Sequence, residues 1–323
     1  GAGDVGGSAE PGPAIELERR VRAHRRHGAE PLLAAGVPLE HHGEGPPRVG
    51  EAPVRALGHE VAGTIDQVGQ GVDSHSIGER VVVIAGERNG SNQITTLGFD
   101  YDGGWAEYVV INAELVVQIP DSLPFEQAAI IPDAVSTPWA AISATGKIQA
   151  GESVAVFGVG GLGIHAVQLL RMIGCGKVIA IDPREDAQAN ALARGADFAF
   201  APDDPDLKKH RGLNAAFDFA GVTPVRKQAL SLLGEQGRLI IIGIANEPIV
   251  IPSDMAFTYM RTQIMGHYGS EAHHVQELVE LARQGRLDLS HSISEILPLD
   301  QAAEAIDKLA NKIGNPIRIV LKP

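Results

Sequence analysis

The sequence contains one glycine-rich turn whose spacing suits a phosphate-bearing cofactor. An apolar segment, 154–157, runs into the stretch 158–163, which reads G-V-G-G-L-G, and a helical pattern follows. This is the G-x-G-x-x-G pattern in the strand–turn–helix context that it requires. Gly158 permits the tight turn, Gly160 leaves room for a pyrophosphate, and Gly163 lets the helix pack closely on the strand. We therefore expect a dinucleotide to bind here.

The residues around this turn narrow the choice of dinucleotide. Gly161 and Leu162 open the helix, where unpaired N–H groups and the helix dipole favour phosphates. Asp182 follows the next apolar segment, and an acidic side chain there accepts hydrogen bonds from the adenine-ribose hydroxyls and repels a 2′-phosphate. This favours NAD over NADP. Arg184 opposes the preference because a nearby arginine can accommodate a 2′-phosphate, although a solvated residue at the start of a helix is the simpler interpretation.

Short apolar strands alternate with helical stretches in the second half of the chain. Six strands are predicted, at 153–157, 177–181, 197–200, 214–219, 237–242 and 262–266. Helices are predicted at 161–173, 184–194 and 224–233. The alternation indicates an α/β fold with a doubly wound parallel sheet of the Rossmann type. Gly221 and Gly243, which follow the fourth and fifth strands, are further candidates for cofactor binding.

The flanking segments have different patterns. Val/Ile-rich segments joined by turn residues predict an irregular antiparallel β domain, with strands at 61–68, 79–84, 105–111 and 114–119. Residues 1–52 are rich in Gly, Pro, Ala, Arg and His without sustained alternation, so they are interpreted as loop or poorly ordered. A helical region is also predicted at 125–146. In the tail, helices are predicted at 271–285 and 299–312 and a strand at 317–321.

Length and composition bound the class of protein. The 323 residues exceed one ordinary domain, so two domains are expected. The net charge of −13 disfavours binding to nucleic acid or to an anionic membrane. No apolar run is long enough to span a membrane and no signal-peptide pattern opens the chain, so we expect a cytoplasmic protein. The single cysteine, Cys175, excludes an intrachain disulfide and is interpreted as a packed thiol.

Several further motifs resemble one family in sequential order. They are L-G-H-E-V-A-G at 57–63, V-G-Q-G-V at 68–72, D-G-G-W-A-E-Y at 102–108, F-D-F-A-G at 217–221, and the closing strand with Arg318. Together with the glycine-rich turn, this set resembles the zinc-type alcohol dehydrogenases of the medium-chain dehydrogenase/reductase superfamily. The resemblance implies a GroES-like catalytic domain, formed by 1–134 and 270–323, around a Rossmann domain at 135–269.

The resemblance also implies a chemical site. His59 would be the histidine ligand of a catalytic zinc, Glu60 would tune or replace a ligand, and Asp133 would stand at the position of another ligand. Thr137 would lie against the nicotinamide, and Arg318 would contact the cofactor pyrophosphate. The implied reaction is hydride transfer between NAD(H) and an alcohol, aldehyde or ketone, with zinc polarising the oxygen. Such proteins form homodimers or homotetramers through the last strand of the Rossmann sheet.

The sequence departs from the family pattern in its first part. Pro38 stands where the family has its first cysteine ligand, and Glu40 stands near the place of a proton-relay hydroxyl. The lobe with four cysteines is reduced to a remnant at 86–97, so no structural zinc is expected. His41 and His42 are candidates for a substitute zinc ligand, or are solvated. Residues 1–52 as a whole are interpreted as a degenerate or frame-altered version of the family start.

Simpler interpretations stand beside these roles. His59 could be a hydrogen-bonded structural histidine, and Asp133 could cap the following turn. Glu60 could pair with Arg318 or another cation instead of a metal, and Arg318 could be a surface arginine on an edge strand. Two tryptophans could line the substrate cleft or belong to the core, namely Trp105 and Trp139.

Two other functions remain open at this point. One is a zinc-independent enoyl or quinone reductase of the same superfamily, in which the protein supplies orientation alone. The lost cysteines favour it, whereas the G-H-E motif and Asp182 oppose it. The other is a cofactor-binding homologue without activity.

Overall fold

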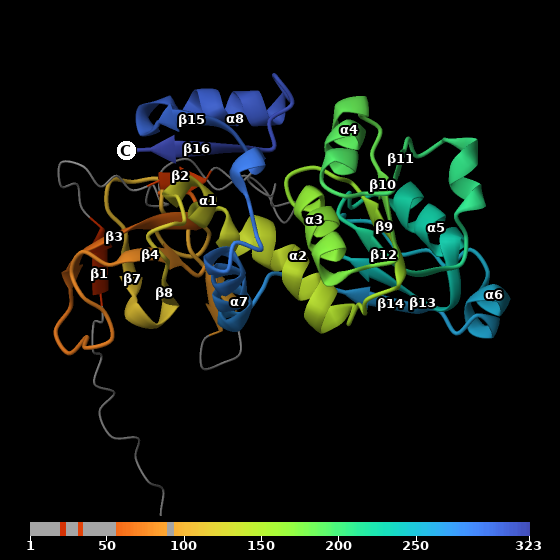
Figure 1. Ribbon diagram of the computed structural model, residues 1–323, viewed down its shortest axis with the longest axis horizontal. Helices are drawn as coiled ribbons and strands as arrows, with labels where there is room; N and C mark the ends of the chain where they lie inside the picture. Colours follow the sequence, from red (N-terminus) through yellow and green to blue (C-terminus); the bar gives the residue numbers. More distant parts are fainter. Residues whose placement is uncertain (1–19, 24–31, 35–55, 89–93) are drawn as a thin grey trace, which may run out of the picture.

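The computed structural model describes residues 20–23, 32–34, 56–88 and 94–323, which form two lobes side by side (Figure 1). One lobe is built on a six-stranded parallel sheet with the strand order β11-β10-β9-β12-β13-β14. Its strands are β9 (Ser153–Phe157), β10 (Lys177–Ile181), β11 (Phe198–Phe200), β12 (Leu213–Asp218), β13 (Leu233–Ile241) and β14 (Gln263–Gly266). Taken from β9, this order is 3-2-1-4-5-6, so the predicted doubly wound Rossmann sheet is confirmed.

Helices cover both faces of this sheet. They are α3 (Gly163–Ile173), α4 (Glu185–Ala193), α5 (Thr223–Leu232) and α6 (Asp254–Tyr259), with a 3₁₀ turn, η4 (Pro205–Lys209), between β11 and β12. The central strands are buried on both sides, which explains their nearly continuous Val, Ile, Ala and Phe content. The strand order reverses between β9 and β12, and such a switch point opens a crevice at the carboxyl ends of the strands.

The other lobe contains an eight-stranded, mainly antiparallel sheet. Its strands are β1 (Arg20–Ala23), β2 (Leu32–Ala34), β3 (Glu60–Val68), β4 (Arg80–Val83), β7 (Val110–Asn112), β8 (Val116–Gln118), β15 (Ile293–Pro298) and β16 (Arg318–Lys322). The long strand β3 pairs with β1, β2 and β4, and β16 lies between β15 and β2. A separate hairpin joins β5 (Gly86–Arg88) to β6 (Ile94–Thr96). The tail of the chain thus completes a sheet begun near its start.

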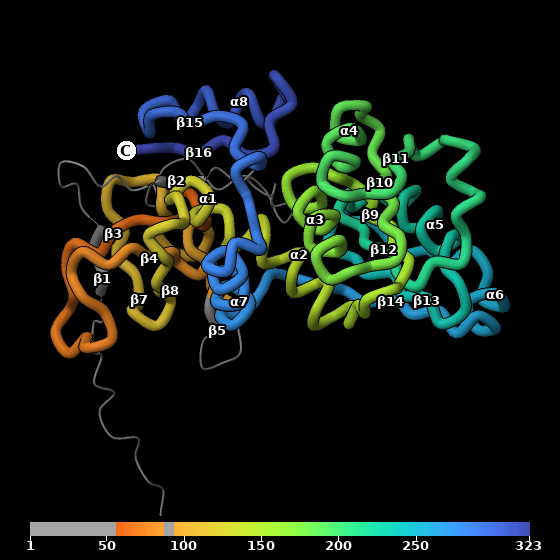
Figure 2. Tube along the Cα trace, in the orientation of Figure 1, coloured from red at the N-terminus to blue at the C-terminus, as the bar shows by residue number. Residues whose placement is uncertain are grey.

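A helical segment joins the two lobes (Figure 2). It consists of α1 (Phe125–Ala129), α2 (Ser136–Ala140) and two π-helical turns, η2 (Ile131–Val135) and η3 (Ala141–Thr145). The prediction of helix at 125–146 is therefore right, but the segment is not a regular α-helix. Pro132 lies in η2 and Pro138 in α2, and a proline cannot donate the i→i−4 hydrogen bond of an α-helix.

The tail adds two helices, α7 (Ala272–Arg283) and α8 (Ala302–Ala310), and two 3₁₀ turns, η5 (Ser290–Ser292) and η6 (Leu299–Gln301). The predicted helices at 271–285 and 299–312 match these positions. Within the described residues, no helix has the length and apolar content needed to cross a bilayer.

Three predictions about the β lobe were wrong in detail. Residues 104–107 form bends instead of a strand, because the backbone N–H groups of Gly104 and Trp105 donate to the carbonyls of Gly58 and Leu57. The segment predicted as a strand at 114–119 begins as a 3₁₀ turn, η1 (Ala113–Leu115), before β8. The region read as loop contains β1 and β2, whose pairing with β3 uses backbone groups that no side-chain alternation reveals.

Candidate active site

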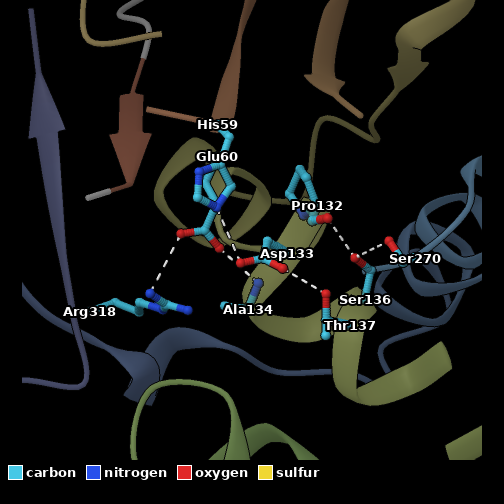
Figure 3. A network of polar contacts seen from close by, with 9 residues as sticks. All are labelled: His59, Glu60, Pro132, Asp133, Ala134, Ser136, Thr137, Ser270 and Arg318. Carbon is cyan, nitrogen blue, oxygen red and sulfur yellow. Dashed lines mark hydrogen bonds and ion pairs between the residues drawn. The ribbon is translucent and has the colours of Figure 1, made fainter. Parts of the chain in front are cut away.

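Three polar side chains meet at the junction of the two lobes (Figure 3). His59 precedes β3, Asp133 belongs to η2, and Thr137 lies one turn further, in α2. Nε2 of His59 faces Oδ2 of Asp133 at 3.2 Å, and Oγ1 of Thr137 donates to Oδ1 of the same carboxylate at 2.6 Å. The sequence prediction that these residues share one site agrees with this placement.

The network shifts the proton affinity of both partners. Burial raises the pKa of Asp133, but the hydrogen bond and charge of His59 and the hydrogen bond from Thr137 outweigh it, so the pKa falls to about 2. Burial lowers the pKa of His59, but Asp133 outweighs it and the net pKa is raised. Asp133 is therefore held as a carboxylate whose two oxygens are both engaged.

Glu60 lies beside this pair but has other partners. Its Oε1 accepts a hydrogen bond from the backbone N–H of Ala134 at 2.8 Å, and its Oε2 lies 3.6 Å from Nη1 of Arg318. Burial raises the pKa of Glu60, while the charge of Arg318 lowers it. The interpretation in which Glu60 pairs with Arg318 thus matches the structure, although Oε2 accepts no hydrogen bond within the described residues.

His59 and Asp133 are candidate donors for a zinc ion. Two ligands of one tetrahedral zinc are separated by about 3.3 Å when each bond is about 2.0–2.1 Å. The 3.2 Å between His59 and Asp133 is compatible with that separation. In the part of the chain that the structure describes, no group of three His, Cys, Asp or Glu side chains is gathered to hold a metal ion. Pro38, Glu40, His41 and His42 lie outside the described residues.

The glycine-rich turn follows β9 at the switch point of the parallel sheet. Gly158 has φ +82°, and an added Cβ would lie 2.9 Å from the backbone nitrogen of Ala220. A Cβ on Gly163 would overlap the carbonyl oxygen of Gly158. In contrast, a Cβ on Gly160 would meet no atom closer than 3.7 Å, so its missing side chain leaves room for something other than protein. This is the division of roles predicted for the three glycines.

Arg318 reaches this turn from the other lobe. An added Cβ on Gly161 would lie 3.4 Å from Cζ of Arg318. Arg318 is buried, and its Nε and Nη2 atoms have no hydrogen-bond partner. The neighbouring helix α3 starts after Leu162 without a side-chain cap. A buried cation with unused donors beside a glycine cradle and an uncapped helix fits a pyrophosphate. Arg318 is not a surface residue and β16 is not an edge strand, so that interpretation was wrong.

Asp182 lies at the carboxyl end of β10, as expected for the ribose position. Its Oδ2 accepts the backbone N–H of Val159 at 3.0 Å, so this carboxylate also supports the glycine-rich turn. Its Oδ1 pairs with Nε of Arg184 at 2.9 Å. The interpretation of Arg184 as a solvated residue was therefore wrong, because its guanidinium binds Asp182.

Asp218 and Arg226 form a buried pair that sequence reasoning missed. Oδ1 of Asp218 accepts the N–H groups of Ala220 and Gly221 at 3.0 and 2.9 Å, and Oδ2 accepts Nε of Arg226 at 3.0 Å. Arg226 also donates to the carbonyl of Gly243 at 3.0 Å. The pair thereby fixes both glycine turns that were candidates for the cofactor site. The motif F-D-F-A-G contained Asp218, but nothing marked Arg226 in its helix.

The two tryptophans have different surroundings. The ring of Trp105 occupies the space beside Gly58, whose φ is +92°, so any larger residue there would collide with the ring. Nε1 of Trp139 donates to Oε2 of Glu277 in α7 at 2.6 Å. On the other side, the ring of Phe99 lies 5.3 Å from the His59 ring. Of these rings, that of Phe99 contacts His59.

Comparison with known proteins decides the family. A model described as an alcohol dehydrogenase GroES-like domain matches residues 36–121, and one described as a zinc-binding dehydrogenase matches residues 161–284. An alcohol dehydrogenase from Geobacillus stearothermophilus is 31% identical over 284 residues, which cover 82% of each chain. The chain belongs to the zinc-type medium-chain alcohol dehydrogenase family. Its match begins at residue 36, earlier than the motifs beginning at residue 57 indicated.

Other members of the family agree in sequence and fold. An (R,R)-butanediol dehydrogenase from Bacillus subtilis is 26% identical over 289 residues, covering 84% of this chain and 82% of that protein. The solved alcohol dehydrogenase of Aeropyrum pernix has a TM-score of 0.79 at 25% identity and covers 98% of this chain and 96% of its own. The GroES-like and Rossmann parts expected from the sequence are thus confirmed, and the chain is an oxidoreductase of the alcohol dehydrogenase type.

Proposed function

We propose that this family member transfers hydride between NAD(H) and an alcohol/carbonyl pair at the junction of its two lobes. One observation carries the proposal: Arg318 lies against Gly161 of the dinucleotide turn and also pairs with Glu60, which is adjacent to His59. The same side chain therefore joins the expected pyrophosphate position to the polar cluster. A dinucleotide held by the turn would extend its nicotinamide toward Thr137 and His59.

The chain's own residues in this cluster supply positioning. Thr137 donates to Asp133, which leaves that carboxylate ionised and fixed toward His59. Fixing a substrate next to the nicotinamide removes rotational and translational freedom before reaction. We propose His59 and Asp133 as two ligands of one catalytic zinc, which when bound would polarise the substrate oxygen. Glu60 supports the site through Arg318 and Ala134 instead of joining the ligands.

Metal content is the first test of this proposal. We expect about one zinc per chain by plasma mass spectrometry of the purified, untagged protein, because His59 and Asp133 would bind the same ion. His59→Ala should lose the metal. His291→Ala, which removes an exposed histidine, should keep it. Equal zinc in both variants would show that the metal is held elsewhere.

A zinc-independent enoyl or quinone reductase is the second candidate. The observation in its favour is that only His59 and Asp133 converge as donors within the described residues. Absence of zinc in the native protein together with NADH-dependent reduction of enals or quinones would select it. NADH binding without turnover on either panel would instead select a cofactor-binding homologue.

We also propose that the protein is a homodimer or homotetramer. The strand β14 is at an edge of the parallel sheet, and two large side chains of α6, the helix before it in the chain, are 77% and 82% exposed, namely Met255 and Tyr259. Exposed apolar side chains beside an open strand edge favour pairing with a second copy. Sedimentation equilibrium tests this, since a monomer at micromolar concentration would contradict it.

A further inference from the structure

His165 is a buried imidazole that the proposed reaction does not use. It belongs to the first turn of α3 and is fully buried, so it cannot touch a bound cofactor. Its Nε2 lies 2.8 Å from Oγ of Ser292, whereas Nδ1 has no hydrogen-bond partner within the described residues. Ser292 is therefore the polar anchor of the ring, and His165 can act on a ligand only through its neighbours.

Ser292 stands directly before a strand that pairs with the last strand of the chain. It ends η5, and β15 begins at the next residue, Ile293, which is the register partner of Arg318 in β16. One residue further, Oγ of Ser294 accepts the backbone N–H of Ile317 at 2.8 Å. The residues that follow Ser292 thus hold the backbone from which the Arg318 side chain extends.

The start of β16 returns to the turn that precedes α3. An added Cβ on Gly161 would lie 3.4 Å from Cζ of Arg318 and 3.5 Å from the carbonyl oxygen of Ile317. Gly161 comes shortly before His165 in the chain. The contacts therefore form a closed path, from α3 to Ser292, across β15 to β16, and back to the dinucleotide turn. Supporting contacts of this kind hold a binding side chain in one position.

The contact between His165 and Ser292 also joins the two lobes. α3 packs on the parallel sheet, whereas β15 belongs to the eight-stranded sheet of the other lobe. Both residues are buried, so removing one partner leaves a polar atom of the other unpaired. Another contact between the same segments is exposed: Nε2 of Gln168 donates to the carbonyl of Asp288 at 2.8 Å. Gln168 thus offers a matched control on the same helix.

We propose that His165 is a positioning residue for the cofactor, which through Ser292 holds Arg318 at the dinucleotide turn. The inference rests on the proposed function, because it requires a dinucleotide at this turn. Arg318 donates to the pyrophosphate, and His165 fixes the place from which it does so. Without the contact, β16 could shift relative to the turn, and a donor that must be ordered on binding contributes less to affinity.

NADH binding, followed by nicotinamide fluorescence, tests this inference without a substrate. Ser292→Ala removes the hydroxyl from His165 and should weaken NADH about five- to tenfold, which corresponds to one hydrogen bond. Ser292→Thr keeps a hydroxyl and should stay within about twofold of the native chain. Gln168→Ala, which breaks the exposed contact of α3, should leave NADH binding unchanged.

A double variant separates positioning from a general structural role. Arg318→Gln lacks the guanidinium that His165 would place. Adding Ser292→Ala to it should therefore weaken NADH by no more than about twofold, whereas independent effects would multiply. Urea unfolding of each variant shows that it is folded. If Ser292→Ala does not fold, Ser292→Cys takes its place, because a thiol fills the site but forms weaker hydrogen bonds.

Three results on the variants would overturn the inference. Unchanged NADH binding in Ser292→Ala would show that the contact does not act on Arg318. Losses that multiply in the double variant would make the contact structural only. Equal losses in Ser292→Ala and Gln168→Ala would assign the effect to the whole docking of the tail on α3. Failure of the native chain to bind NADH would instead reject the proposed function, and this inference with it.

Discussion

Nη1 of Arg318 in β16 lies 3.6 Å from Oε2 of Glu60 in β3, and the two side chains are 6% and 0% exposed. The pair joins the last strand of the chain to the strand that follows His59. It also leaves Nε and Nη2 of Arg318 free of protein partners, beside the dinucleotide turn. Arg318 thus pairs with Glu60 through Nη1 and keeps two unused N–H donor atoms beside the dinucleotide turn.

A double-mutant cycle separates these two roles of Arg318. Arg318→Gln should lower the free energy of unfolding by about 3 kcal/mol, because it leaves Glu60 buried without its cation. Adding Glu60→Gln should recover part of that loss in urea unfolding. NADH binding should stay weak in the double variant, since the donors for the pyrophosphate are still missing. Recovery of NADH binding along with stability would contradict the assigned cofactor contact.

Two alanine substitutions in the glycine-rich turn should have different effects, one on cofactor binding and one on stability. Gly160→Ala should unfold like the native chain but weaken NADH binding, because its methyl group makes only an ordinary contact with Arg184 and enters the cradle. Gly163→Ala should lose about 2 kcal/mol or more of stability, since its Cβ would overlap a backbone carbonyl. Thermal unfolding and fluorescence titration on both variants check this. Similar stability losses in both would refute the division of roles.

Breaking the buried pair of Asp218 and Arg226 should destabilise the Rossmann lobe. The side chains are 0% and 4% exposed, so Asp218→Asn leaves an uncompensated cation and should cost about 3–5 kcal/mol. Urea unfolding gives the magnitude. Hydrogen exchange should be faster at Ala220 and Gly221, whose N–H groups would donate to a neutral amide oxygen instead of a carboxylate. A loss below about 1 kcal/mol would mean that the pair is not a main support of these turns.

Acid should destabilise the chain in part through His165 in α3. Burial lowers the pKa of His165 to about 3, so the folded chain holds it neutral while the unfolded chain protonates it below about pH 6.5. Stability from this group is complete above that pH and is lost as pH falls toward 3. Between about pH 6 and pH 4, native protein should lose roughly 2–3 kcal/mol more than His165→Gln. His291→Gln, at an exposed position, should follow the native curve.

The single thiol should be inert in the folded protein. Burial and the charge of Glu152 raise the pKa of Cys175 to about 11, and only 3% of the residue is exposed. At about pH 8 almost no thiolate forms, so iodoacetamide should leave the native chain unmodified over a time in which the urea-unfolded chain takes up one label. Mass spectrometry distinguishes the two. Rapid labelling of native protein would show local opening near β10.

Local geometry explains which parts of the structure could be predicted. The glycine-rich turn could be predicted because the positions of Gly158, Gly160 and Gly163 require glycine within six residues. The central parallel strands could be predicted because burial on both faces leaves continuous apolar runs. His59, Asp133 and Thr137 were placed together by family resemblance. The domain boundaries at 134 and 269 stay predictions.

The remainder depends on contacts between distant segments. The pairing of Arg184 with Asp182 depends on the side-chain rotamer of Arg184. The contact of Arg226 with two turns depends on how α5 packs on the sheet. The bends at 104–107 arise because that segment pairs with residues 56–58 instead of with a strand. No periodicity in a single segment records such pairings.

The place of β16 in its sheet sets an order for assembly. The parallel sheet is complete once Gly266 has been made, whereas β2 obtains one of its two neighbours only when Arg318–Lys322 emerges from the ribosome. Until then, β2 has an unpaired edge. An unpaired strand edge can form hydrogen bonds with another chain. The dinucleotide-binding lobe would therefore be able to fold first, while the β lobe of the same nascent chain still lacks β16.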